Sequence, residues 1–208
     1  MAWIRGQGDA AAEIFNPTRS ASFGQGDIGS HTNIYGLPAL GWMVPVDHHQ
    51  LFLGGGIFGT AGLGVNYTQQ PYFVPNPIDS SKIIPATLNA YSSISMMIMA
   101  LGLAWKPSSK WSIGIALDAA DESVGFQETT SGNMSNGFPF SAGMNFSKSA
   151  NAYGIGATLG VVYKVNKLVT LGASYRSPIC FTPLTWQETN ESVPNPVTGQ
   201  INATGSTE

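Results

Sequence analysis

The sequence has few charged residues. Only 10% of its 208 residues are Asp, Glu, Lys or Arg, whereas an ordinary soluble domain has about 25%. A soluble protein covers its surface with such residues, so this chain must present an uncharged surface to its surroundings. The formal net charge of −3 also provides no basic patch for nucleic acid. The composition therefore excludes nucleic-acid binding and is unusual for a soluble protein.

Cysteine and long apolar runs are scarce as well. The single cysteine, Cys180, excludes an internal disulfide and a thiolate zinc cluster. No apolar run reaches the roughly 20 residues of a transmembrane helix, which excludes a helical membrane protein. Residues 1–13 lack the apolar stretch of a signal peptide, so for an exported protein we expect a processed or truncated N-terminus.

Residue patterns for chemistry are also lacking. His48 and His49 are adjacent in a predicted turn, where two side chains rarely converge on one metal without further ligands. No histidine belongs to a recognisable triad motif. We therefore expect no metal, no cofactor and no catalysis.

Alternating hydrophobicity is the main pattern that is present. Residues 153–165 have apolar side chains at odd positions and mostly small ones at even positions, which predicts a strand with one apolar face. After a tight turn at Asn166 and Lys167 the alternation resumes over residues 169–176, so the two strands form a hairpin. Similar hairpins are predicted over residues 97–117 and 37–64.

Long polar connections follow the short hairpin turns. They comprise residues 68–88, 119–150 and 181 to the end. Strands joined alternately by short turns and long loops are typical of outer-membrane barrels. Aromatic residues stand near the strand ends, as interfacial girdles require; they are Trp42, Tyr67, Tyr91, Trp105, Trp111, Tyr163 and Tyr175. We therefore predict an all-β fold, a transmembrane antiparallel β-barrel of the bacterial outer membrane, with about six or seven strands in this chain.

A soluble β-sandwich, serving as a binding or adhesin module, is the main alternative because its strands alternate too. A sandwich covers its outer faces with charge, whereas this chain has small uncharged residues opposite its apolar ones. The barrel prediction explains both features.

Three segments resemble the FadL/TodX family of outer-membrane channels for long-chain fatty acids and aromatic hydrocarbons. Asn16 and Pro17 are similar to the family's Asn-Pro-Ala motif, with Thr18 in place of the alanine. Residues 37–67 are similar to a family hairpin, and residues 172–178 are similar to a phrase that ends family strands. The resemblance implies a barrel of about fourteen strands, of which this chain is the N-terminal half.

The resemblance also implies a domain organisation and a function. Residues 1–30, with Asn16 and Pro17, would form a plug or hatch segment, and residues 31–208 the N-terminal portion of the barrel. The complete barrel would be a monomer surrounded by outer-membrane lipid, and it would take up hydrophobic small molecules passively. An outer-membrane lipid hydrolase is the alternative function, and it would need a Ser/His or carboxylate constellation at the barrel mouth.

Several residues are candidates for the substrate path. An apolar cluster in a loop that should be wet indicates an interaction site or a loop packed on itself; its members are Phe138, Phe140, Met144 and Phe146. The resemblance places this loop in the family's initial substrate groove. Asp118 and Arg176 share the polar faces of their strands. Charges at membrane depth face the lumen and pair, so both are expected along the conduit or at its outer rim.

Gly54, Gly55 and Gly56 lie early in an otherwise apolar strand. Such a run invites a bulge or bend. The resemblance implies an inward strand kink that opens the barrel wall sideways. Alternatively, these glycines make room for the hatch or for crowded neighbours.

Overall fold

The computed structural model describes residues 6–23, 26–47, 50–186, 192–194 and 201–203. The regular secondary structure of these residues consists of strands. None of the described residues belongs to a helix that could cross a bilayer. The long strands are β4 (Tyr35–Asp47), β5 (Leu51–Pro75), β6 (Ile83–Trp105), β7 (Trp111–Asn133) and β8 (Pro139–Lys164). The shorter strands are β1 (Gln7–Phe15), β2 (Ser20–Ser22), β3 (Asp27–Gly29), β9 (Thr170–Arg176), β10 (Cys180–Phe181), β11 (Ser192–Pro194) and β12 (Ile201–Ala203).

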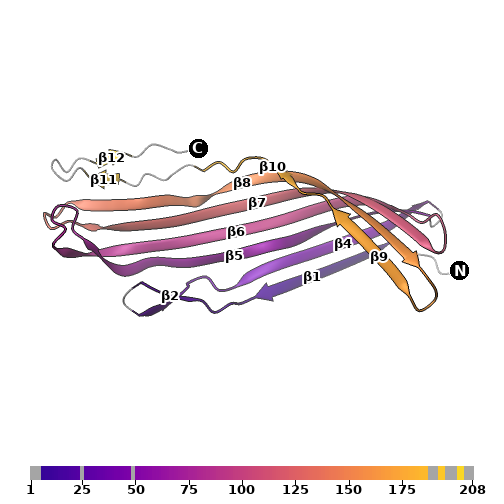
Figure 1. The fold of residues 1–208 in the computed structure, drawn as a ribbon, viewed down its shortest axis with the longest axis horizontal. Helices are drawn as coiled ribbons and strands as arrows, with labels where there is room; N and C mark the ends of the chain where they lie inside the picture. The colour runs from indigo at the N-terminus through magenta and orange to yellow at the C-terminus, as the bar shows by residue number, and fades with distance from the viewer. Residues whose placement is uncertain (1–5, 24–25, 48–49, 187–191, 195–200, 204–208) are drawn as a thin grey trace.

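One antiparallel sheet contains most of these strands. Its order is β1, β4, β5, β6, β7, β8, and both β9 and β10 pair with β8 at the far edge. The Ser177 amide donates to the Ala157 carbonyl (2.9 Å) between β9 and β10, so the two form one edge strand. The resulting seven antiparallel strands curl into a half-barrel. Figure 1 shows β4 to β8 side by side, with β9 passing in front of them.

This topology confirms the predicted barrel fold. The other sheets in the described part of the chain, β2 with β3 and β11 with β12, have two strands each. Because the described residues form no second layer of comparable size against the curled sheet, the β-sandwich alternative is wrong.

The convex face of the sheet carries a continuous apolar band. In β6 the band covers residues 97–105, in β7 residues 111–119 and in β8 residues 153–163, and its side chains are largely exposed. These spans of 9 to 11 residues agree with the roughly 9–11 residues that a tilted strand needs to cross a bilayer. Trp111 and Tyr163 stack at one end of the band, with ring centroids 4.4 Å apart.

The strands continue far beyond this band. β5 to β8 have 23 to 26 residues each, so the prediction of long loops over residues 68–88 and 119–150 is wrong for most of these residues. Hydrophobicity marks the band rather than the strand ends, because more polar segments, which in β7 include Asp121, Glu122 and Glu128, continue the same ladder. Short turns at residues 76–82 and 134–138 close the hairpins. We call the end of the half-barrel at which these two turns lie the distal end.

The three glycines of β5 pair without interruption on both edges of the strand; their partners are Met43, Trp42 and Gly41 in β4 and Gly102, Leu101 and Ala100 in β6. β5 has two irregularities, and both lie further along, between Gly59 and Ala61 and between Tyr67 and Gln70. A Cβ atom on Gly56 would lie 2.6 Å from the Leu40 carbonyl oxygen, and one on Gly55 would lie 2.8 Å from that of Ala100. The glycines therefore allow close approach of backbones, in agreement with the alternative that they make room for crowded neighbours, and no register shift occurs at them.

The expected hatch segment is divided between the wall and the interior. Gln7–Phe15 forms the edge strand β1 and pairs with β4 from Tyr35 to Met43. After β1 the chain turns onto the concave face, where the Phe23 ring contacts that of Tyr67 (centroids 5.6 Å apart). Of the residues expected in the hatch, Gln7–Phe15 therefore belong to the wall instead.

Candidate functional site

Very small side chains line the concave face opposite the apolar band. Residues paired directly across an antiparallel ladder point to the same face of the sheet. One row across the strands contains Gly41, Gly56, Ala100, Asp118 and Gly156, and the next contains Met43, Gly54, Gly102, Ala116, Thr158 and Arg176. Small barrels fill their interior with side chains, so rows of glycine and alanine leave space for something else.

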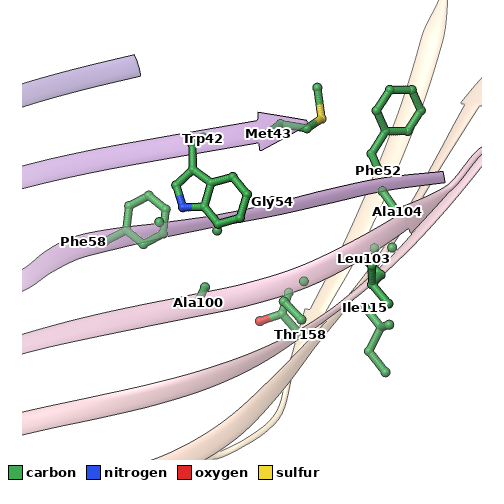
Figure 2. A pocket seen from close by; sticks show the side chains of 16 residues that line it. Trp42, Met43, Phe52, Gly54, Phe58, Ala100, Leu103, Ala104, Ile115 and Thr158 are labelled. Atoms are coloured by element: carbon green, nitrogen blue, oxygen red, sulfur yellow. The ribbon is translucent and has the colours of Figure 1, made fainter. Parts of the chain in front are cut away.

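This floor forms a hollow of about 360 Å³. Met43, Phe52 and Phe58 border it on the β4–β5 side, and Thr158 of β8 lies at the opposite side (Figure 2). Its lining is almost entirely apolar, with Thr158 as the polar side chain among the residues that line it. The hollow can therefore accept an apolar body with one polar group near β8.

Asp118 and Arg176 meet at the β8 side of the hollow. The Arg176 Nε atom lies 3.4 Å from Asp118 Oδ2. Thr158 joins them, because its hydroxyl donates to Asp118 Oδ2 (2.6 Å) and accepts from Arg176 Nε (3.2 Å). The Asp118 side chain is 1% exposed and that of Arg176 is 49% exposed.

The ion pair lies at the level of the apolar band. Its row passes through Gly102 and Ala116, which lie near the middle of the apolar band. The band therefore faces outward at the same level at which two opposite charges pair on the concave face. The sequence placed Asp118 and Arg176 on one face, and the structure brings them together.

The four apolar candidates near the distal end do not form one patch. Phe140 is 8% exposed and packs with Ile84 and Met134. Phe146 packs instead with Phe126 and Trp186, with ring centroids 5.0 and 6.4 Å away. Six residues along a strand correspond to about 20 Å, so the two groups are separate. Phe138 and Met144 are exposed, at 48% and 51%.

The backbone pairing between β4 and β5 ends near the distal border of the apolar band. Their ladder ends at Ala39 and Phe58, although β4 continues to Tyr35 and β5 to Pro75. Pro38 has no amide hydrogen to offer, and the bulge at Thr60 shifts the facing strand. We call the unpaired stretch of residues 35–38 and 59–65 the β4–β5 gap.

Side chains bridge this gap. The Tyr35 hydroxyl donates to the Gly64 carbonyl (2.5 Å) and accepts from Arg19 Nη2 (2.6 Å). Beyond the gap, the His31 amide donates to the Asn66 carbonyl (2.7 Å), and the Asn66 amide donates to the Ser30 hydroxyl (3.1 Å). The segment after β1 thus seals the wall where β4 leaves it.

Sequence reasoning missed several of these residues. Thr158, Arg19 and Tyr35 were not singled out, because each acts through a partner on another strand or segment. The sequence offers one signal for Thr158, its even position in the alternating strand, which places it on the same face as the small residues. Asn16 and Pro17 lie in the turn after β1, outside the strands. His48 and His49 lie outside the described residues. The described residues contain no group of three or more side chains that could hold a metal ion.

A curled antiparallel sheet with an apolar convex band and a hollow concave face has the form of half of a β-barrel. Two crystal structures of the toluene transporter TodX from Pseudomonas putida share this fold, with TM-scores of 0.65 and 0.61. Their sequence identities to this chain are 19% and 18%, and the matches cover 95% of it. The chain spans about half the length of TodX, 51% and 50% in the two structures. No family model and no curated protein matches the sequence.

Proposed function

We propose that this chain is part of an outer-membrane channel that takes up hydrophobic small molecules by passive diffusion. The observation that carries the proposal is the small-residue hollow on the concave face, directly behind an apolar band of membrane-spanning length. A hydrophobic compound would gain from leaving water for this hollow without any reaction. The TodX fold supports the same class of cargo.

The proposed route begins at the distal end. Phe138 and Met144 are exposed toward that end, and the aromatic cluster of Phe126, Phe146 and Trp186 lies between them and the hollow. The hollow then holds the compound at the level of the band. Residues 16–30, which include Asn16 and Pro17, are proposed as the hatch because Phe23 and Arg19 lie against the concave face.

The β4–β5 gap is the proposed exit. A lateral exit at the border of the apolar band would release an apolar compound into lipid, so that the compound would not have to cross water. The β4–β5 gap, rather than Gly54, Gly55 and Gly56, is proposed as the lateral opening. Pairing between β4 and β5 is missing at the gap and is complete at the three glycines.

Filling the hollow tests the channel. Ala116 lines the hollow, whereas the next residue, Leu117, is 70% exposed on the convex face. Ala116→Phe in the full-length protein should reduce transfer of labelled dodecane into proteoliposomes at least about fivefold, whereas Leu117→Phe should leave it unchanged. Equal transfer by both variants would contradict the proposal, and turnover of an ester by the purified protein would favour the hydrolase alternative.

Closing the gap tests the exit. A Cβ on Gly59 would lie 3.3 Å from the Leu37 Cα atom, so cysteines at the two positions would be neighbours and can be tested for a cross-link. Leu37→Cys with Gly59→Cys, in a Cys180→Ser background, should slow transfer when oxidised and restore it when reduced. Transfer that is the same in both redox states would rule out this exit.

A further inference from the structure

The end of the hollow at β8 combines an apolar floor with unused hydrogen-bond donors. Arg176 uses Nε for Thr158 and Asp118, and its two terminal nitrogens have no hydrogen-bond partner within the described residues. The Arg176 side chain is half exposed and lies beside Thr158, which lines the hollow. A compound whose body occupies the hollow can therefore place a polar group against Arg176.

The charge at this end is already neutralised. Asp118 is fully buried and lies 3.4 Å from Arg176, so the pair presents N–H donors without net charge. A carboxylate brought here would lose its hydration. Repulsion from the Asp118 carboxylate would offset its attraction to Arg176. A carbonyl or another neutral acceptor would lose much less hydration and could still accept a hydrogen bond.

Building on the proposed function, we propose that Arg176 is a donor site in the conduit for hydrophobic compounds with a neutral acceptor group, and that Asp118 makes the site reject carboxylates. The polar group of the cargo is therefore a ketone, ester or similar neutral acceptor. Asp118 determines this specificity through Arg176 and does not itself contact the cargo.

Three probes with the same chain length test this inference. Labelled 2-dodecanone, dodecanoate and dodecane are equilibrated at pH 8 with proteoliposomes of the full-length protein, and binding to protein-free liposomes is subtracted. The wild-type protein should bind 2-dodecanone more tightly than dodecanoate. Asp118→Asn keeps the side-chain shape and removes the counter-charge, so it should raise dodecanoate affinity about tenfold and leave dodecane unchanged.

Two further variants complete the test. Arg176→Gln changes a half-exposed side chain and should weaken 2-dodecanone binding about tenfold, without affecting dodecane. Asp121→Asn is the matched control, because Asp121 lies on the same strand and points to the opposite face. It should change none of the three affinities.

The outcomes separate this inference from the proposed function. Binding of dodecane with the same dodecanoate affinity in wild type and Asp118→Asn would overturn the inference and leave the channel intact. Tighter binding of dodecanoate than of 2-dodecanone by the wild type would overturn it as well. Failure of all three probes to bind would overturn the proposed function and the inference with it.

Discussion

Replacing Gly56 with alanine should destabilise the barrel, although alanine is the smallest side chain that can be added. The new Cβ would lie 2.6 Å from the Leu40 carbonyl oxygen and 2.6 Å from Cζ of Phe58. The phenyl ring can rotate, but the carbonyl belongs to the β4–β5 ladder and can move only if the strands separate. Overpacking of this kind costs about 1–3 kcal/mol, and the fixed carbonyl places Gly56→Ala toward the upper end of that range.

Gly41 supplies the matched control. It is the direct ladder partner of Gly56 and lies on the same face, but a Cβ there would have no atom within 4 Å. Gly41→Ala should therefore be neutral or stabilising by about 0.4–1 kcal/mol, because it restricts the unfolded chain.

Urea unfolding of the full-length protein in lipid vesicles, followed by tryptophan fluorescence, measures both free energies. An unfolding free energy for Gly56→Ala equal to or above that of Gly41→Ala would refute the close-approach reasoning. It would also restore the view that these glycines are sites of bending.

Other predictions concern the distal end and the gap. Phe140→Ala should destabilise the β7–β8 turn by about 3 kcal/mol, since that ring is buried; half-exposed Phe138→Ser should change amide exchange there little, and equal effects would contradict the packing described. Tyr35→Phe removes the hydroxyl that bridges the β4–β5 gap, so it should cost about 1 kcal/mol and speed amide exchange along the gap; unchanged exchange would mean that the hydroxyl does not hold it. In the β5–β6 turn, hydrogen bonds from the Ser81 hydroxyl and then from Lys82 lower the pKa of Asp79 below its ordinary value near 3.8. The resulting stabilisation is present above that value and is lost as pH falls through the lowered pKa. The NMR chemical shift of the Ser81 amide should therefore change with a midpoint below pH 3.8, and a midpoint at 3.8 would contradict the lowered pKa.

The sequence alone determined the class of fold and the turns at the band end of the hairpins. Period-two alternation is a local property, so it predicted which residues face outward and that Asp118 and Arg176 share a face. Scarcity of charge indicated a surface that meets something other than water. The turns at residues 107–110 and 166–167 also follow from local sequence and are confirmed.

Which residues meet across strands depends on the register and curvature of the folded sheet. Register and curl join positions far apart in the chain, as when Thr158 donates to Asp118 across 40 residues, and no local pattern encodes such a pairing. The same register extends β7 and β8 through polar residues, separates Phe140 from Phe146, and places β1 in the wall. It also determines that Gly56 faces a carbonyl while its partner Gly41 faces open space, because backbone approach depends on how neighbouring strands coil.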